Sequence, residues 1–121
     1  MAQVNIVNVT SILPFTINGA VTTSGVNIID VPADKLYKVN AIIIANVDGT
    51  NSATVNIAVS TDNGSSIYHL AKTVAVPADS TLVITDKNSS FYLDETDLLQ
   101  VQASANSDLE YTVSGEILDD A

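Results

Sequence analysis

Apolar and polar residues alternate with a period of two along most of this 121-residue chain. The clearest stretch is 53–60, where apolar residues occupy every second position and polar or small residues lie between them. Such alternation is typical of a β-strand with one buried face. No window of about 11 residues combines helical spacing with a cap and a stop. The pattern therefore predicts an all-β protein.

Similar segments recur between turn signals along the rest of the chain. The predicted strands cover residues 4–10, 15–21, 26–31, 37–47, 53–60, 67–76, 81–85, 99–103 and 109–117, with 91–93 as a brief strand or edge. Strands separated by turns every 8–12 residues or so are typical of sandwiches. We expect a single antiparallel β-sandwich of about eight or nine strands, either Ig-like or a jelly roll.

The segment 37–47 differs from the other predicted strands because apolar residues occupy consecutive positions from Ala41 to Ala45. A strand with apolar groups on both faces is usually central and covered on each side. We expect Ile43 to lie between two layers. This strand also favours contact with further copies of the chain.

A two-part signature occurs twice. Asn18-Gly19 and Val31-Pro32-Ala33-Asp34 recur as Asn63-Gly64 and Val76-Pro77-Ala78-Asp79, both displaced by 45 positions (63 − 18 and 76 − 31). Asn-Gly between alternating residues indicates a two-residue hairpin turn, and Pro ends a strand because it lacks an N–H. The repetition indicates either an internal duplication or equivalent turns that use the same residues.

The N-terminal segment lies outside both repeated units. We expect residues 1–13 to form a strand that ends before Pro14, and residues 14–121 to form the sandwich domain. A strand outside the repeated units is available to pair with the sheet edge of a neighbouring subunit. Residues 1–13 are therefore predicted to act as an inter-subunit arm.

Charge excludes several classes of partner. The chain has 14 acids, four Lys and no Arg, a net charge of −10, so we expect neither nucleic acid nor an anionic membrane as a partner. Only 15% of the residues are charged, which indicates a surface partly covered by partners or by copies of the chain. Residues 91–121 hold eight acids and no cation, forming either a solvated acidic face or a docking surface for a basic partner.

No pattern of catalytic residues is present. His69 is the only imidazole and lies inside a predicted strand, where a hydrogen-bonded or surface-facing side chain is the usual role. There is no Gly-x-Ser-x-Gly elbow and no Gly-rich phosphate loop. We predict no enzymatic activity, no catalytic residues and no cofactor.

One acidic turn has ligands that calcium uses. Asp94, Glu95 and Asp97 fall close together, and Asp62 or Asp48 from another loop could join them. Calcium takes six to eight oxygen ligands, but a solvated acidic turn has the same composition. We predict no metal site, and the absence of Cys excludes thiolate ligands and disulfides.

The chain has six aromatic residues and no Trp, which disfavours a stacking platform for carbohydrate.

Several segments together resemble a known family. They are Ala53-Thr-Val-Asn-Ile-Ala-Val-Ser-Thr-Asp-Asn-Gly, Tyr68-His-Leu-Ala, Val76-Pro-Ala-Asp-Ser-Thr-Leu-Val-Ile, Phe91-Tyr-Leu-Asp-Glu-Thr-Asp-Leu-Leu and Val101-Gln-Ala-Ser-Ala. This combination of a polar hairpin, a Pro-Ala turn and a Tyr-Leu-x-Glu-x-Asp-like turn resembles the small virion proteins of tailed bacteriophages. The resemblance covers roughly residues 37–117.

The resemblance implies a non-enzymatic structural protein of the virion. We expect a capsid decoration or cement subunit that binds itself and a major capsid or other virion protein by multivalent docking. Neck, baseplate or tail-fibre components are alternatives within the same class. A non-viral β-sandwich module for adhesion or ligand binding is the alternative from another class.

Overall fold

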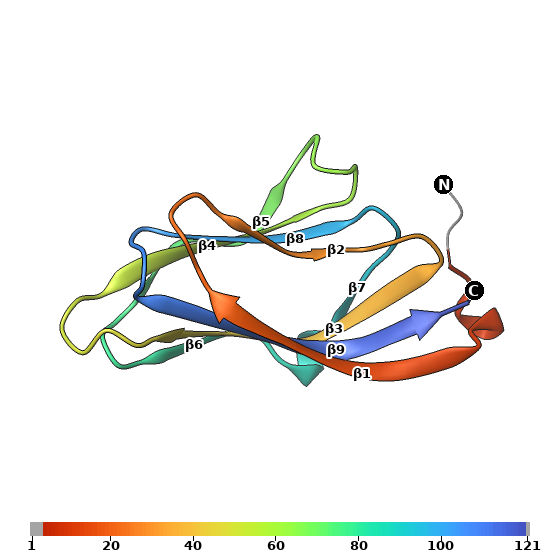
Figure 1. The fold of residues 1–121 in the computed structure, drawn as a ribbon, viewed down its shortest axis with the longest axis horizontal. Coiled ribbons are helices and arrows are strands. Elements are labelled where there is room, and N and C mark those ends of the chain that lie inside the picture. Colours follow the sequence, from red (N-terminus) through yellow and green to blue (C-terminus); the bar gives the residue numbers. More distant parts are fainter. Residues whose placement is uncertain (1–3, 121) are drawn as a thin grey trace.

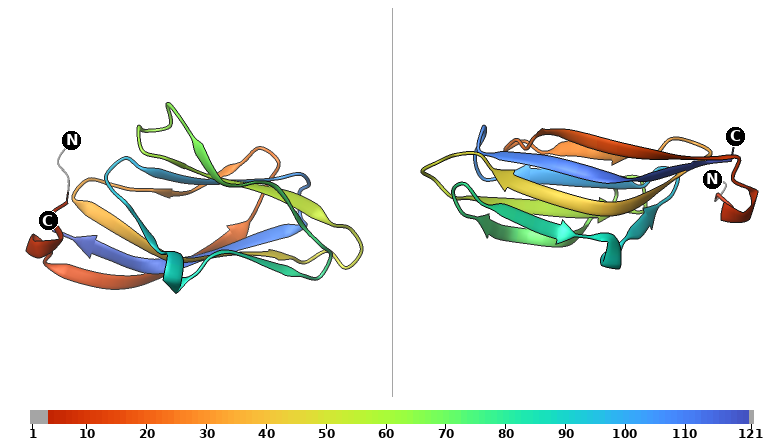
Figure 2. Two further views of the ribbon diagram at one scale, coloured as in Figure 1. Left: turned by 180° about the vertical axis from the view of Figure 1, so that it is seen from behind. Right: turned by 90° about the horizontal axis from the view of Figure 1, so that it is seen from below.

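The computed structural model describes residues 4–120, which form two antiparallel sheets packed face to face (Figures 1 and 2). The expected β-sandwich of about nine strands is confirmed. Its elements are η1 (Ile6–Asn8), β1 (Ser11–Ala20), β2 (Val26–Asp30), β3 (Lys35–Asn46), β4 (Ala53–Ser60), β5 (Tyr68–Val76), β6 (Thr81–Thr85), η2 (Lys87–Ser89), β7 (Phe91–Leu93), β8 (Leu98–Ala103) and β9 (Leu109–Asp119).

Strand pairing decides between the two expected types of sandwich. β1 pairs with β9, β2 with β8, β3 with β6 and β7, and β4 with β5, so the chain is a long hairpin folded about the β4–β5 loop. Further pairing of β9 with β3 and of β8 with β4 rolls this hairpin into two sheets, β1-β9-β3-β6 and β2-β8-β4-β5. This nested order defines a jelly roll.

Apolar residues on the facing sides of the sheets form one core. The largest fully buried side chains come from both sheets: Ile42, Ile44, Ile57, Leu93, Leu99, Leu109, Val21, Val39, Val55, Val76, Val101 and Val113. The pairing of β3 with β9 shifts between Val39 and Ala41, which marks a bulge at Asn40. The extra residue lets Val39 and Ile42 both point inward although they are three positions apart.

The bulge also explains why β3 shows apolar residues in succession. Ile42 and Ile44 are fully buried, whereas Ile43 alternates with them, is only half-buried and faces outward. The prediction that Ile43 lies between two layers is therefore wrong for the single chain. β3 is central within its own sheet, between β9 on one side and β6 and β7 on the other.

The predicted hairpin turn at Asn18-Gly19 is wrong. Both residues lie inside β1, whose pairing with β9 is continuous from Ser11 to Ala20. Gly19 is needed there for a different reason, since a Cβ at this position would lie 2.9 Å from the Tyr111 hydroxyl oxygen. The glycine leaves room for the Tyr111 ring.

The other turn signals do mark turns. Asn63 and Gly64 both have positive φ, 59° and 91°, within the seven-residue loop between β4 and β5. Asp34 and Asp79 adopt φ of 64° and 56° at the ends of the two Val-Pro-Ala-Asp segments, which follow β2 and β5. The repeated segments are thus equivalent turns. The two Asn-Gly pairs have unrelated roles, which argues against duplicated hairpins.

The N-terminal segment is arranged differently from the expected strand. Residues 4–10 form no strand; they contain η1, capped by the Asn5 side chain, which accepts a hydrogen bond from the Val7 N–H. Val4 and Val9 pack on Leu36 and Leu118. β1 then continues through Pro14, which an edge strand tolerates. Residues 1–3, part of the predicted arm, lie outside the described residues.

Candidate functional site

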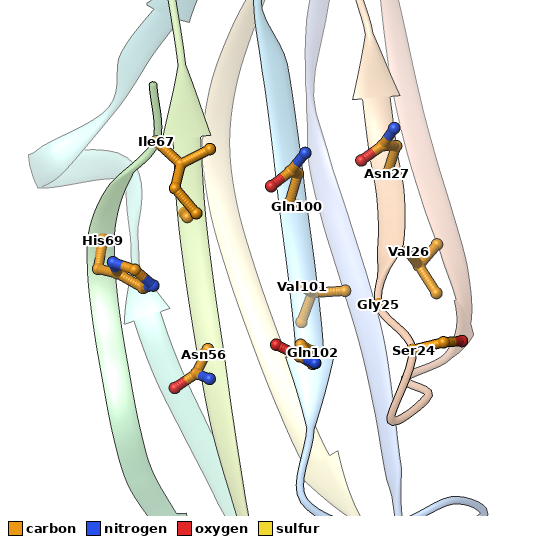
Figure 3. Close-up of a pocket in the computed structure, with 11 residues that line it drawn as sticks. Ser24, Gly25, Val26, Asn27, Asn56, Ile67, His69, Gln100, Val101 and Gln102 are labelled. Atoms are coloured by element: carbon orange, nitrogen blue, oxygen red, sulfur yellow. The ribbon is translucent and has the colours of Figure 1, made fainter. Parts of the chain in front are cut away.

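A groove crosses the outer face of the sheet β2-β8-β4-β5 (Figure 3). Strand register builds its first row: Asn27 of β2 lies opposite Gln100 of β8, Gln100 lies opposite Ala58 of β4, and Ala58 lies opposite His69 of β5. Residues directly opposite each other share one face of a sheet. Because Ala58 is the smallest side chain in this row, its position forms a hollow between Gln100 and His69.

A second row of amides lies beside the first. Gln102 lies opposite Asn56. The Gln102 Nε2 donates a hydrogen bond of 2.7 Å to the carbonyl oxygen of Thr23, and the Asn56 Oδ1 accepts one of 2.6 Å from the backbone N–H of Thr73. These bonds fix both side chains and leave Gln102 Oε1 and Asn56 Nδ2 directed to the groove side of the sheet.

The alternation within β8 explains why its amides face outward. Leu99 and Val101 are buried in the core, and Gln100 and Gln102 occupy the positions between them. Across residues 4–120, the side chains of Asn27, Gln100 and His69 have no hydrogen-bond partner within the chain. The first row therefore presents free donors and acceptors to a ligand.

The groove has a volume of about 350 Å³ and no Asp, Glu, Lys or Arg in its lining. That volume is near the lower end of small-molecule sites, which span roughly 300–1,000 Å³. Its side chains offer hydrogen bonding from amides and one imidazole, with an apolar contact supplied by Ile67. Sequence analysis missed this site. The available signal was amides at alternate positions of otherwise apolar strands.

His69 is exposed on β5 and forms one end of the first row. No acidic side chain lines the groove with it, so the groove lacks the carboxylate partner that usually orients a catalytic histidine. His69 therefore contributes one wall of the groove.

The acidic turn of Asp94, Glu95 and Asp97 is a structural element rather than a solvated surface. Glu95 and Asp97 are both 7% exposed. Asp97 Oδ2 accepts a hydrogen bond from the Asp94 N–H, and Glu95 Oε1 accepts one from the Asp34 N–H. Desolvation by burial is the main reason that the pKa of Asp97 is raised. These carboxylates bind backbone groups and join two turns.

Asp48 and Asp62, the other candidate calcium ligands, also hold their own loops. Asp48 Oδ1 accepts hydrogen bonds from the N–H groups of Thr50 and Asn51, which lower the pKa of Asp48. The N–H of Ser66 lowers the pKa of Asp62 in the same way. Among residues 4–120, no three His, Asp or Glu side chains are grouped to hold a metal ion.

Acidic residues collect at both ends of the sandwich. One end contains Asp34, Asp94, Glu95 and Asp97, where β3 begins. The other contains Asp48, Asp79 and Asp108, where β3 ends. The acids of residues 91–121 are divided between these ends and β9. They do not form a single acidic face.

Large apolar side chains are exposed mainly in two places: the N-terminal segment that includes η1 and the start of β1, and the edge strand β5. Ile6, Val7, Ile12 and Leu13 define the N-terminal apolar edge, with exposed fractions from 56% to 86%. Tyr68 and Leu70 define the β5 apolar edge. β1 and β5 are both edge strands, and each pairs on one side only. No helix among the described residues is long and apolar enough to cross a membrane.

No protein-family model matches the sequence, and no curated protein is significantly similar to it. Solved structures share its fold. Bacillus endospore appendages, described as disulfide-linked pili, match with 13% identity, 92% coverage of this chain, 88% of theirs and a TM-score of 0.54. The acidic stable capsid of Helicobacter pylori bacteriophage KHP30 matches with 6% identity, 93% and 91% coverage and a TM-score of 0.51. At these identities the likeness establishes the fold alone.

Proposed function

We propose that this chain is a non-enzymatic structural subunit of a bacteriophage virion that binds copies of itself. The observation that carries the proposal is the N-terminal apolar edge. Four of the ten large apolar side chains exposed among the described residues fall between residues 6 and 13: Ile6 and Val7 lie in η1, and Ile12 and Leu13 lie at the start of the edge strand β1. Exposed apolar groups beside an unpaired strand edge favour protein–protein contact.

The second exposed edge makes repeated contacts possible. The β5 apolar edge lies on the other sheet, so one subunit can contact two neighbours through different surfaces. Contacts between unlike surfaces close into rings or extend along a lattice. Each contact need only be modest, because repetition raises the effective concentration of the next one.

Within this class, a capsid decoration or cement subunit on a major capsid protein is the role we favour, and residues 1–13 are its proposed arm. The likeness to a phage capsid structure supports a shell protein, and the resemblance of the turns supports the tailed-phage assignment. The likeness to disulfide-linked pili is less informative about assembly, since this chain contains no Cys. Neck, baseplate and tail-fibre positions are the alternative placements.

Particles purified from the phage or prophage that encodes the chain test the proposal. Quantitative mass spectrometry should find many copies per particle, and electron microscopy should place them at symmetry-related positions. An Ile12→Asp/Leu13→Asp variant should be depleted from particles, whereas Asn88→Ala, an exposed change in η2, should be retained. Absence of the chain from particles, or full occupancy by the double variant, would contradict the proposal.

A further inference from the structure

We propose that the groove on the outer face of β2-β8-β4-β5 binds a neutral oligosaccharide. The inference rests on the amide rows and is independent of the assembly proposed above. A virion subunit with this groove would bind glycans on the face of one sheet while its strand edges contact other subunits.

The rows have the hydrogen-bonding chemistry of a sugar site. Each Asn or Gln side chain presents a donor and an acceptor side by side, and sugar hydroxyls can bind both. Gln100 and Asn27 lie opposite each other without partners within residues 4–120, and Gln102 and Asn56 are held in position by bonds to backbone groups. A fixed amide loses little conformational entropy on binding.

The extent of the first row favours a chain of sugars over a single ring. Four strands contribute to it, so the distance from Asn27 to His69 covers three strand spacings, roughly 14 Å. Ala58, only 4% exposed, forms the floor of the hollow between Gln100 and His69, so a ring would rest on the side chains around it. Figure 3 shows Asn27, Gln100, Asn56 and His69 distributed across this face.

The absence of charge in the lining selects against ionic ligands. Apart from His69, the four strands of this sheet contain only Asp30 and Lys72 as acidic or basic residues, and neither of these two lines the groove. A phosphate, a carboxylate or a cation that entered the groove would lose its hydration and would find no Asp, Glu, Lys or Arg there to compensate its charge. Ile67, 44% exposed, gives an apolar contact for a sugar ring, so that binding does not require an aromatic platform.

Amide-detected NMR titration of the full chain tests the proposal. The probes are maltohexaose, cellohexaose, mannohexaose and hexa-N-acetylchitohexaose, with a hexamer of galacturonic acid as the charged comparison. We expect at least one neutral hexamer to shift the side-chain NH₂ signals of Asn27, Gln100 and Gln102 in a saturable manner. The galacturonic acid hexamer should leave these signals unchanged.

Two variants locate the binding. Gln100→Ala removes a free amide and should weaken binding about tenfold. Ala58→Gln fills the hollow and should abolish binding. Asn18→Ala, which removes an exposed amide from β1 of the other sheet, should bind like the unchanged chain. If Ala58→Gln fails to fold, Gln100→Ala alone tests the location of the site, because the Gln100 side chain has no hydrogen-bond partner within residues 4–120 whose loss could affect folding.

Three results would overturn the inference. They are the absence of saturable binding by every neutral hexamer, shifts confined to residues outside the groove, and undiminished binding by Gln100→Ala. Binding of the galacturonic acid hexamer alone is a case of the first result, and the lining has no Lys or Arg that would pair with its carboxylates.

Discussion

The Glu95 carboxylate accepts a hydrogen bond of 2.9 Å from the backbone N–H of Asp34, 61 residues earlier in the chain. Asp34 has a positive φ of 64°, a conformation that needs support from its surroundings in a residue other than Gly. Thr96 and Val31 add a backbone hydrogen bond between the same two turns. The acidic turn therefore connects the β2–β3 turn to the β7–β8 turn.

Removal of this carboxylate should destabilise the fold. Glu95→Ala leaves the Asp34 N–H without its acceptor at a site where Glu95 is only 7% exposed, so we expect a loss of about 1.5–3 kcal/mol in the free energy of unfolding. Glu95→Gln keeps a side-chain oxygen acceptor and should lose less than about 1 kcal/mol. Urea unfolding measures both. Equal stability of Glu95→Ala and the unchanged chain would contradict this role.

A close approach between β9 and the bulged part of β3 makes Gly115 irreplaceable. A Cβ at Gly115 would lie 1.8 Å from the carbonyl oxygen of Lys38, and that oxygen belongs to backbone that cannot rotate away. Gly115→Ala should lower the free energy of unfolding by about 3 kcal/mol or more.

Gly49→Ala is the matched control for Gly115→Ala. Its nearest neighbour would be Asp79 Oδ2 at 3.6 Å, an ordinary contact, so stability should change by less than about 0.5 kcal/mol. Thermal unfolding compares the two variants. Similar melting temperatures for the two variants would show that β3 and β9 can move apart to accept a Cβ at position 115, and would contradict this prediction.

The carboxyl pair at the other end of the sandwich predicts a pH dependence. Desolvation by burial raises the pKa of Asp108 above its ordinary 3.8, and the nearby Asp48 charge raises it further. The folded chain therefore binds this proton more readily than the unfolded chain, and stability should increase as pH falls from 7 towards the raised pKa. The lowered pKa of Asp48 means that its own stabilising contribution is lost only below pH 3.8.

Asp108→Asn tests this sign. At pH 7 the variant should have a larger free energy of unfolding than the unchanged chain. Its stability should increase less as the pH falls, and the raised pKa of Asp97 supplies part of the increase that remains. Asp30→Asn alters the net charge equally at an exposed site of β2 and serves as the control. Urea unfolding of the unchanged chain and of both variants at pH values from 7 to 4 measures the change in stability. An Asp108→Asn variant with an undiminished gain would contradict the assignment.

Strand positions were predictable because alternation is a local property of the sequence. The predicted segment 53–60 coincides with β4, and 81–85 with β6. The continuation of β1 through Asn18-Gly19 was not predictable in this way, since the Tyr111 ring that packs on Gly19 lies more than 90 residues later in the chain. Ile43 was misplaced for a related reason: the bulge at Asn40 depends on the pairing with β9.

The groove depends still more on long-range register. Asn27, Ala58, His69 and Gln100 belong to four strands, and only the pairing of β2, β8, β4 and β5 places them in one row. The acidic turn was recognised as a cluster, but its burial follows from contacts with the β2–β3 turn. Sequence composition alone makes Glu95 resemble a solvated or metal-binding residue.

Sedimentation of the purified chain from about 1 to 100 μM is the most direct test that the protein functions by binding copies of itself. We expect a concentration-dependent species heavier than the 12.7 kDa monomer, and we expect the Ile12→Asp/Leu13→Asp variant to lose this species while keeping the circular dichroism spectrum of a folded chain. A compact monomer at every concentration, or assembly that the double variant leaves unchanged, would contradict it.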